Sequence, residues 1–153
     1  MQVAGLIVCG IFTGFIGAVT MNIFLRWVSS SFKEPVNMIK AIGSYATGSE
    51  KNAIFSGTLF HLLSGAFFGI IYTGIFFKMG AAVLPQSLFI GVGFGFAHGL
   101  LVSYGLMLVS MENHPIRQYR NATFSIGLLY LIAHVIYGAV MGLSIGLVSV
   151  LFG

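Results

Sequence analysis

The chain has 153 residues, of which 58% are hydrophobic and only 7% are charged, with a formal net charge of +4. So few ionisable side chains cannot cover the surface of a soluble domain of this size, and we expect an integral membrane protein. The basic residues lie between apolar stretches instead of forming a basic surface, which argues against nucleic acid as a partner. The single cysteine, Cys9, excludes disulfide frameworks, zinc knuckles and CxxC redox chemistry within the chain.

Four apolar stretches are each long enough to cross a bilayer, which takes about twenty residues in a helix. They cover approximately residues 3–25, 53–77, 84–109 and 122–151. The first is not a typical signal peptide, because no basic residue precedes it and its apolar run is too long, so we expect an uncleaved anchor. The pattern predicts an all-α, polytopic membrane protein whose four transmembrane helices form a compact bundle, with residues 1–153 as a single membrane domain.

The longest connection, residues 26–52, is rich in Ser, Lys, Glu, Asn and Gly. Within it, residues 35–43 begin with a proline, end with a glycine and carry apolar side chains at three-residue spacing, which predicts a short helix. We expect that helix to lie on the membrane surface or against a partner, and an irregular loop is the alternative. Trp27, beside Arg26, is typical of an anchor at the membrane interface.

Basic residues are distributed unevenly among the connections, and the positive-inside rule turns this bias into a topology. The second connection has Lys78 alone, whereas the first and third hold the other basic residues, namely Arg26, Lys33, Lys40, Lys51, Arg117 and Arg120. We therefore expect both termini outside and the connections 26–52 and 110–121 in the cytoplasm, in a prokaryotic inner or plasma membrane.

Glycines recur at four-residue intervals in all four spans, and such residues share one face of a helix and allow close packing. The second and fourth spans add a histidine to this stripe, as His61-x3-Gly65-x3-Gly69 and His134-x3-Gly138-x3-Gly142. We expect these glycines to pack helix against helix. The other members of the set are Gly10, Gly14, Gly91, Gly95 and Gly99.

The stripes also suggest an internal duplication. Gly10 aligns with Gly91 and Gly14 with Gly95, while the His-Gly-Gly triplets of the second and fourth spans align with each other. Corresponding spans cross the membrane in the same direction, which predicts a parallel two-plus-two repeat. Convergence of unrelated helices on the same small-residue spacing is the alternative.

Three histidines fall at similar depth. At a rise of about 1.5 Å per residue, His61 lies about 12 Å, His98 about 16 Å and His134 about 18 Å from the cytoplasmic ends of their spans. Polar groups at this depth usually face the bundle interior, where they pair with one another or form a site. We therefore expect a polar layer that also contains Asn22, Ser64, Ser103, Tyr104 and Tyr137.

Two interpretations of this layer stay open. The side chains can satisfy one another as hydrogen-bonding contacts between helices. Alternatively, His61, His98 and His134 are candidate ligands of haem b or a chlorin, with the glycines making room for the macrocycle. A three-histidine metal site is less favoured, because the spans contain no carboxylate to orient the imidazoles.

The connections offer little catalytic chemistry. We expect His114, beside Pro115, to be solvated, and Glu112 to lie at a solvated helix end. The chain has no nucleophile elbow, Walker loop, zinc-protease helix or paired carboxylates, so we do not expect an enzyme.

The sequence resembles a group of small, uncharacterised prokaryotic membrane proteins with four helices. The matching features are the glycine-followed histidines and two segments, Gly14-Phe-Ile-Gly-Ala-Val-Thr-Met-Asn22 and Asn37-Met-Ile-Lys-Ala-Ile-Gly43. The resemblance implies the four-helix architecture and brings no activity with it.

We interpret the protein as a noncatalytic subunit of a larger membrane complex, of the respiratory or photosynthetic kind. Its expected partners are bilayer lipid, some of it bound, and other integral membrane subunits or further copies of itself. The main alternative is a haem- or chlorin-binding electron-transfer subunit. A small transporter or channel is a third class, which transmembrane carboxylates or a broken helix would favour, and the sequence has no sign of either.

Overall fold

The computed structural model describes residues 2–32 and 37–152. Its elements are α1 (Val3–Phe32), α2 (Met38–Thr47), α3 (Ala53–Lys78), α4 (Gln86–Asn113), the short 3₁₀ helix η1 (Arg117–Asn121) and α5 (Phe124–Phe152). Within the described residues, four helices (α1, α3, α4 and α5) are long and apolar enough to span a membrane. The predicted all-α bundle of a membrane protein is therefore confirmed.

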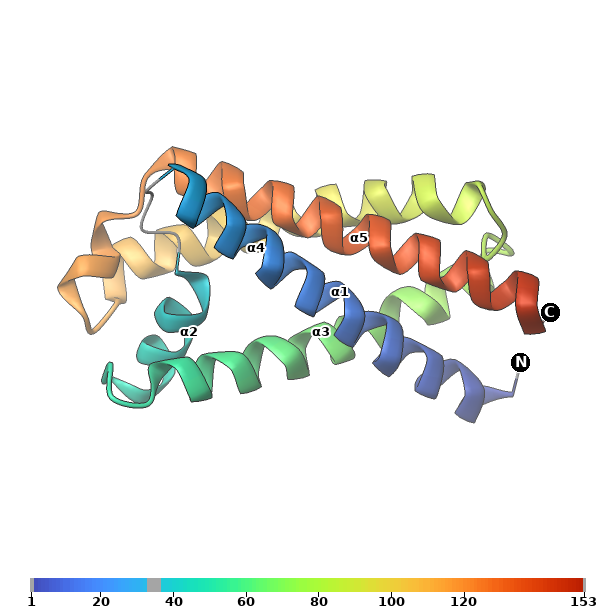
Figure 1. Ribbon diagram of the computed structural model, residues 1–153, viewed down its shortest axis with the longest axis horizontal. Coiled ribbons are helices and arrows are strands. Elements are labelled where there is room, and N and C mark those ends of the chain that lie inside the picture. Colours follow the sequence, from blue (N-terminus) through green and yellow to red (C-terminus); the bar gives the residue numbers. More distant parts are fainter. Residues whose placement is uncertain (1, 33–36, 153) are drawn as a thin grey trace.

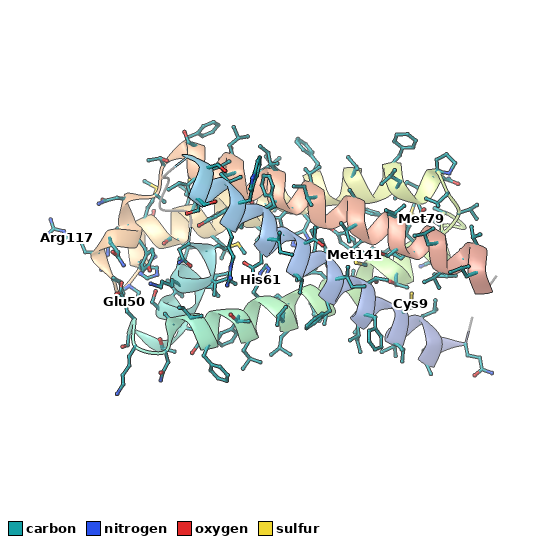
Figure 2. The ribbon with its side chains drawn as sticks, viewed as in Figure 1. Cys9, Glu50, His61, Met79, Arg117 and Met141 are labelled. Carbon is teal, nitrogen blue, oxygen red and sulfur yellow. The ribbon has the colours of Figure 1, made fainter. Side chains whose placement is uncertain are left out.

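The four long helices run along the same axis of the molecule (Figure 1). The chain ends and the turn between α3 and α4 lie at one end of the bundle, and α2 and η1 lie at the other. Figure 2 shows Met79 at the first of these ends, with Glu50 and Arg117 at the second. Both termini thus lie at the same end of the bundle; which membrane face that end occupies stays a prediction.

Two spanning helices extend beyond the apolar stretches that predicted them. α1 continues past residue 25 and takes Arg26 and Trp27 into its last turns, and α4 continues past residue 109 to Asn113. In the extension of α1, the Ser30 hydroxyl donates to the Trp27 carbonyl at 2.8 Å. Hydropathy marks where the lipid-compatible sequence ends, and a helix ends where its backbone bonding stops.

The short helix of the first connection is longer than predicted and ends at a different glycine. Asn37 caps its start by accepting from the backbone N–H of Lys40 at 3.0 Å. Its end is Gly48, whose φ of 68° is a left-handed value that favours glycine. Gly43, predicted as the stop, lies inside the helix, and the predicted start at residues 35–36 lies outside the described residues.

Gly43 marks the place where α2 crosses α3. A Cβ on Gly43 would overlap the Ala53 carbonyl, and a Cβ on Gly57 would overlap the Ile39 carbonyl. The two backbones therefore touch at paired glycines, and α2 is held against α3 at the end of the bundle.

Glycines also pair the spanning helices, as α1 with α3 and as α4 with α5. Gly10 and Gly14 lie against Gly69 and Gly65, with a Cβ on any of them meeting backbone or Cβ atoms of the facing helix. Between α4 and α5, the corresponding set is Gly91, Gly95 and Gly99 against His134, Gly138 and Gly142. All of these contacts are made within the chain.

The two helix pairs resemble each other but differ in register by one helical turn. Gly14 lies over Gly65 and Gly69, whereas Gly95, its counterpart in the sequence alignment, lies over His134 and Gly138. The alignment that superposes the two His-Gly-Gly triplets therefore does not superpose the two crossings. The internal duplication stays a prediction.

The molecule thus consists of two halves, α1–α2–α3 and α4–η1–α5, which join chiefly where α1 packs against α5. Met21 of α1 and Met141 and Ile145 of α5 are buried in the core, and Figure 2 shows Met141 inside the bundle. The backbones of α3 and α4 stay apart and meet through aromatic rings, as at Tyr72 and Phe94. This separation leaves space between the halves.

Candidate functional site: a histidine-lined cavity

A cavity of about 1050 Å³ lies between the two halves, and all five α-helices and η1 contribute to its lining. It lies toward the end of the bundle that carries α2, and the lining there includes His114, Gln118, Tyr119, Asn121 and Ala122. Its volume is at the upper end of the range for ligand pockets. His61, His98 and His134 all line this one cavity, which the sequence could not establish.

His61 extends from α3 and is nearly buried, with Figure 2 showing it in the interior of the bundle. Its Nε2 lies 3.2 Å from the Ala18 carbonyl oxygen of α1. A carbonyl oxygen only accepts hydrogen bonds, so Nε2 carries the hydrogen. The Nδ1 of a neutral His61 therefore keeps its lone pair.

His134 is fixed in the opposite tautomer. Its Nδ1 lies 2.7 Å from the Tyr130 carbonyl oxygen, one turn earlier on α5, and therefore donates to it. The Ser103 hydroxyl of α4 lies 3.2 Å from the same nitrogen and is a second acceptor of its N–H, in a bifurcated hydrogen bond. The Nε2 of His134 keeps its lone pair.

His98 pairs with Tyr72 across the gap between α4 and α3. The Tyr72 hydroxyl lies 3.1 Å from the Phe94 carbonyl and 3.0 Å from Nδ1 of His98. A hydroxyl has one hydrogen, so it can donate fully to Phe94 only if Nδ1 of His98 donates to Tyr72. In that arrangement Nε2 of His98 also keeps its lone pair.

The second nitrogen of each imidazole has no partner in the protein. Among the described residues, the buried side-chain nitrogen and oxygen atoms that lack a hydrogen-bond partner are Thr73 Oγ1 and Ser87 Oγ. The remaining nitrogens of the three histidines have no protein partner and are not sealed in protein. Three histidines therefore line the cavity, and each has one ring nitrogen bonded to the protein and one without a protein partner, a division of roles also found in metal-ligating histidines.

The histidines are not arranged to hold a bare metal ion. No group of three His, Cys, Asp or Glu side chains in the described part of the chain could do so. The ring centroids of His98 and His134 lie 5.3 Å apart, so the two rings are in direct contact. They leave no room for a macrocycle between them, so they do not bind one iron from opposite faces in this arrangement. Phe68 packs on the His98 ring at 4.2 Å.

The remaining members of the predicted polar layer are dispersed. Tyr137 donates to the Gly65 carbonyl at 2.7 Å, and Ser64 and Ser103 line the cavity with the histidines. Tyr104 instead packs on Phe124, with ring centroids 5.4 Å apart. Asn22 lines a second, smaller cavity of about 290 Å³, formed by α1, α3 and residues 37–39.

Sequence analysis missed two tyrosines of the site. Tyr72 holds the ring of His98, and the Tyr130 carbonyl holds that of His134. The signal for Tyr72 was its position on α3, where it continues the face that carries His61 and Gly65. Tyr130 acts through its backbone, which no side-chain pattern reveals.

The prediction that His114 is solvated is wrong, because its side chain is 1% exposed. Its Nε2 donates to the Ala41 carbonyl of α2 at 3.0 Å, and its Nδ1 accepts from the N–H of Ile116 at 3.0 Å. The ring packs between Tyr45 and Tyr119. Burial and the nearby Glu50 carboxylate raise the pKa of the Tyr119 hydroxyl. His114 joins the two halves at the end of the cavity.

Comparison with known proteins yields a family and no activity. Residues 4–150 match the model of a family described as "Family of unknown function (DUF6789)". Neither a curated protein nor a solved structure matches the chain. The match covers nearly the whole chain, which therefore belongs to this family of unknown function.

Proposed function

We propose that the protein is a noncatalytic membrane subunit that holds one tetrapyrrole, a haem or a chlorin, in the cavity between its halves. The observation that carries this proposal is that three histidines, each with one ring nitrogen that has no protein partner, line one cavity of about 1050 Å³. A neutral imidazole nitrogen is the usual protein ligand of such a metal centre. Because the residues do not form an ion site by themselves, the ligand brings its own metal.

The surroundings of the histidines suit a planar apolar ligand. Aromatic and aliphatic side chains form most of the lining, with Phe60, Phe68 and Val102 among them. The Phe68 ring packs against the His98 imidazole and shields that side of the imidazole from water. Ligation by a single imidazole, or by His61 together with one of the other two, is compatible with the contact between His98 and His134.

The absorption spectrum of protein purified from its own membranes tests this proposal. We expect a Soret band, or chlorin bands, at a constant ratio to protein under conditions that keep weakly bound cofactor. A preparation that stays colourless under those conditions, and that binds no added haem, would overturn the proposal.

We further propose that the protein works as part of a larger assembly. Little of the chain lies outside the spanning helices, and their outer faces are apolar and exposed, for example at Phe55, Phe89 and Leu101. The glycine stripes, in contrast, contact other helices of the same chain, so they are not evidence for a partner subunit. Affinity purification from native membranes in mild detergent is expected to recover a stoichiometric membrane partner. Recovery of a monomer alone would contradict this part.

A further inference from the structure

The cavity has one permanently charged side chain in its described lining, that of Lys40 on α2. No Asp or Glu among the described residues lines the cavity with it. Asn37, Gln118 and Asn121 add polar groups to the lining from α2 and the connection before α5. The cavity is therefore cationic and polar toward α2, and carries imidazoles deeper in the bundle.

Lys40 and the histidines lie close enough to contact one bound ligand. α2 crosses α3 at Gly57, where the backbone of Gly57 touches that of Ile39, the neighbour of Lys40. Gly57 precedes His61 by four residues, which is one helical turn or about 6 Å of rise. A long, flexible lysine side chain at that level is within reach of the edge of a ligand whose centre lies at the histidines.

Membrane topology alone would account for a lysine in this connection, but it would not place that lysine in the cavity. Lys51 and Lys78 serve as the comparison, since both are exposed and neither lines the cavity. Lys40 is half-buried and lines it. A cation in a partly apolar cavity without a carboxylate in the described lining is complementary to an acidic ligand.

We propose that Lys40 binds an acidic group of the ligand, so that the cavity selects tetrapyrroles that carry free carboxylates. This inference rests on the proposed function and adds the orientation of the ligand. The carboxylate edge faces α2, and the metal centre lies at the histidine layer. Lys40 is thus a specificity-determining residue, distinct from the imidazoles that ligate the metal.

A comparison of haem b with its dimethyl ester tests the inference, because esterification removes the carboxylate charges and keeps the macrocycle and iron. We expect the purified protein to bind haem b about tenfold more tightly than the ester, as one charge-assisted contact in a partly buried site allows. Lys40→Gln is expected to abolish this preference and Lys40→Arg to keep most of it. The matched control, Lys51→Gln, is expected to leave the preference unchanged.

The outcomes separate the two proposals. If neither haem b nor the ester binds, the proposed function fails. If both bind wild-type protein with equal affinity, or if Lys40→Gln keeps the preference for haem b, the role of Lys40 is overturned and the histidine site stands. The comparison of the two ligands on wild-type protein decides the matter even if Lys40→Gln does not fold.

Discussion

The three intramembrane histidines differ in which nitrogen carries the hydrogen, and this difference follows from single contacts. His61 donates from Nε2 to a carbonyl of α1, whereas His134 donates from Nδ1 to a carbonyl of its own helix. His98 donates from Nδ1 to the Tyr72 hydroxyl when that hydroxyl donates to the Phe94 carbonyl. In this arrangement the N–H of each imidazole bonds to the protein, and the other nitrogen has no protein partner.

The nitrogen chemical shifts of histidine test these assignments directly. With ¹⁵N-labelled histidine in the ligand-free protein, we expect His61 in the Nε2–H form and His98 and His134 in the Nδ1–H form. Tyr72→Phe removes the acceptor of His98 and is expected to alter the shifts of His98 while leaving those of His61 unchanged. If His134 were found in the Nε2–H form, the assignment of its free lone pair to the cavity would be wrong.

The contacts of His114 lead to a prediction about the stability of the protein. His114→Phe keeps a ring between Tyr45 and Tyr119 but removes the bonds to Ala41 and Ile116. Losing both bonds, and leaving the Ile116 N–H without its partner, is expected to cost about 2 to 3 kcal/mol of unfolding free energy. Thermal unfolding in detergent measures it.

The control for His114→Phe is Asn113→Ala, which changes an exposed neighbour. We expect this control to stay within about 0.5 kcal/mol of the wild-type protein. Equal stability of the two variants would contradict the role of His114 in joining the halves.

At the scale of elements, backbone contacts at glycines decide how the helices pair. Gly57→Ala places a methyl group on the Ile39 carbonyl, so α2 must move away from α3. We expect a loss of about 1 to 3 kcal/mol, the usual cost of overpacking. Gly74→Ala, on the same helix, is the control, because a Cβ there meets no atom within 4 Å. A thermal unfolding midpoint of Gly57→Ala at or above that of Gly74→Ala would contradict the crossing.

The helices themselves were predictable, because their apolar length is a strong signal. The crossing of α2 over α3 was not predictable, because the sequence does not distinguish a glycine that ends a helix from one, such as Gly43, at which two helices touch. The depths of the histidines followed from counting residues, but the rotation of each helix depends on packing. This is why Asn22 and Tyr104, at suitable depths, lie away from the histidine cavity, whereas Tyr72 lies beside it.

At the scale of the whole molecule, the cavity arises because the two halves join along α1 and α5 and diverge between α3 and α4. No single span carries this feature, so no pattern within a span predicts it. The orientation of the whole bundle in the membrane is a separate question. The distribution of basic residues predicts it.

Site-directed labelling tests that orientation. In a Cys9→Ala background, Ser49→Cys, next to Glu50, and Met79→Cys introduce exposed thiols at opposite ends of the bundle (Figure 2). We expect an impermeant maleimide added to whole cells to label the cysteine at position 79 and to spare the one at 49 until the membrane is opened. The reverse pattern would place both termini in the cytoplasm.

Titration of the purified, detergent-solubilised protein with haem b tests the central claim most directly. We predict that the Soret change saturates at one haem per chain. We also predict that His61→Ala, His98→Ala or His134→Ala, at least one of them, abolishes this change while circular dichroism shows the helices intact. Haem uptake without saturation, or saturable uptake that none of the three substitutions alters, would contradict the assignment of the cavity as a tetrapyrrole site.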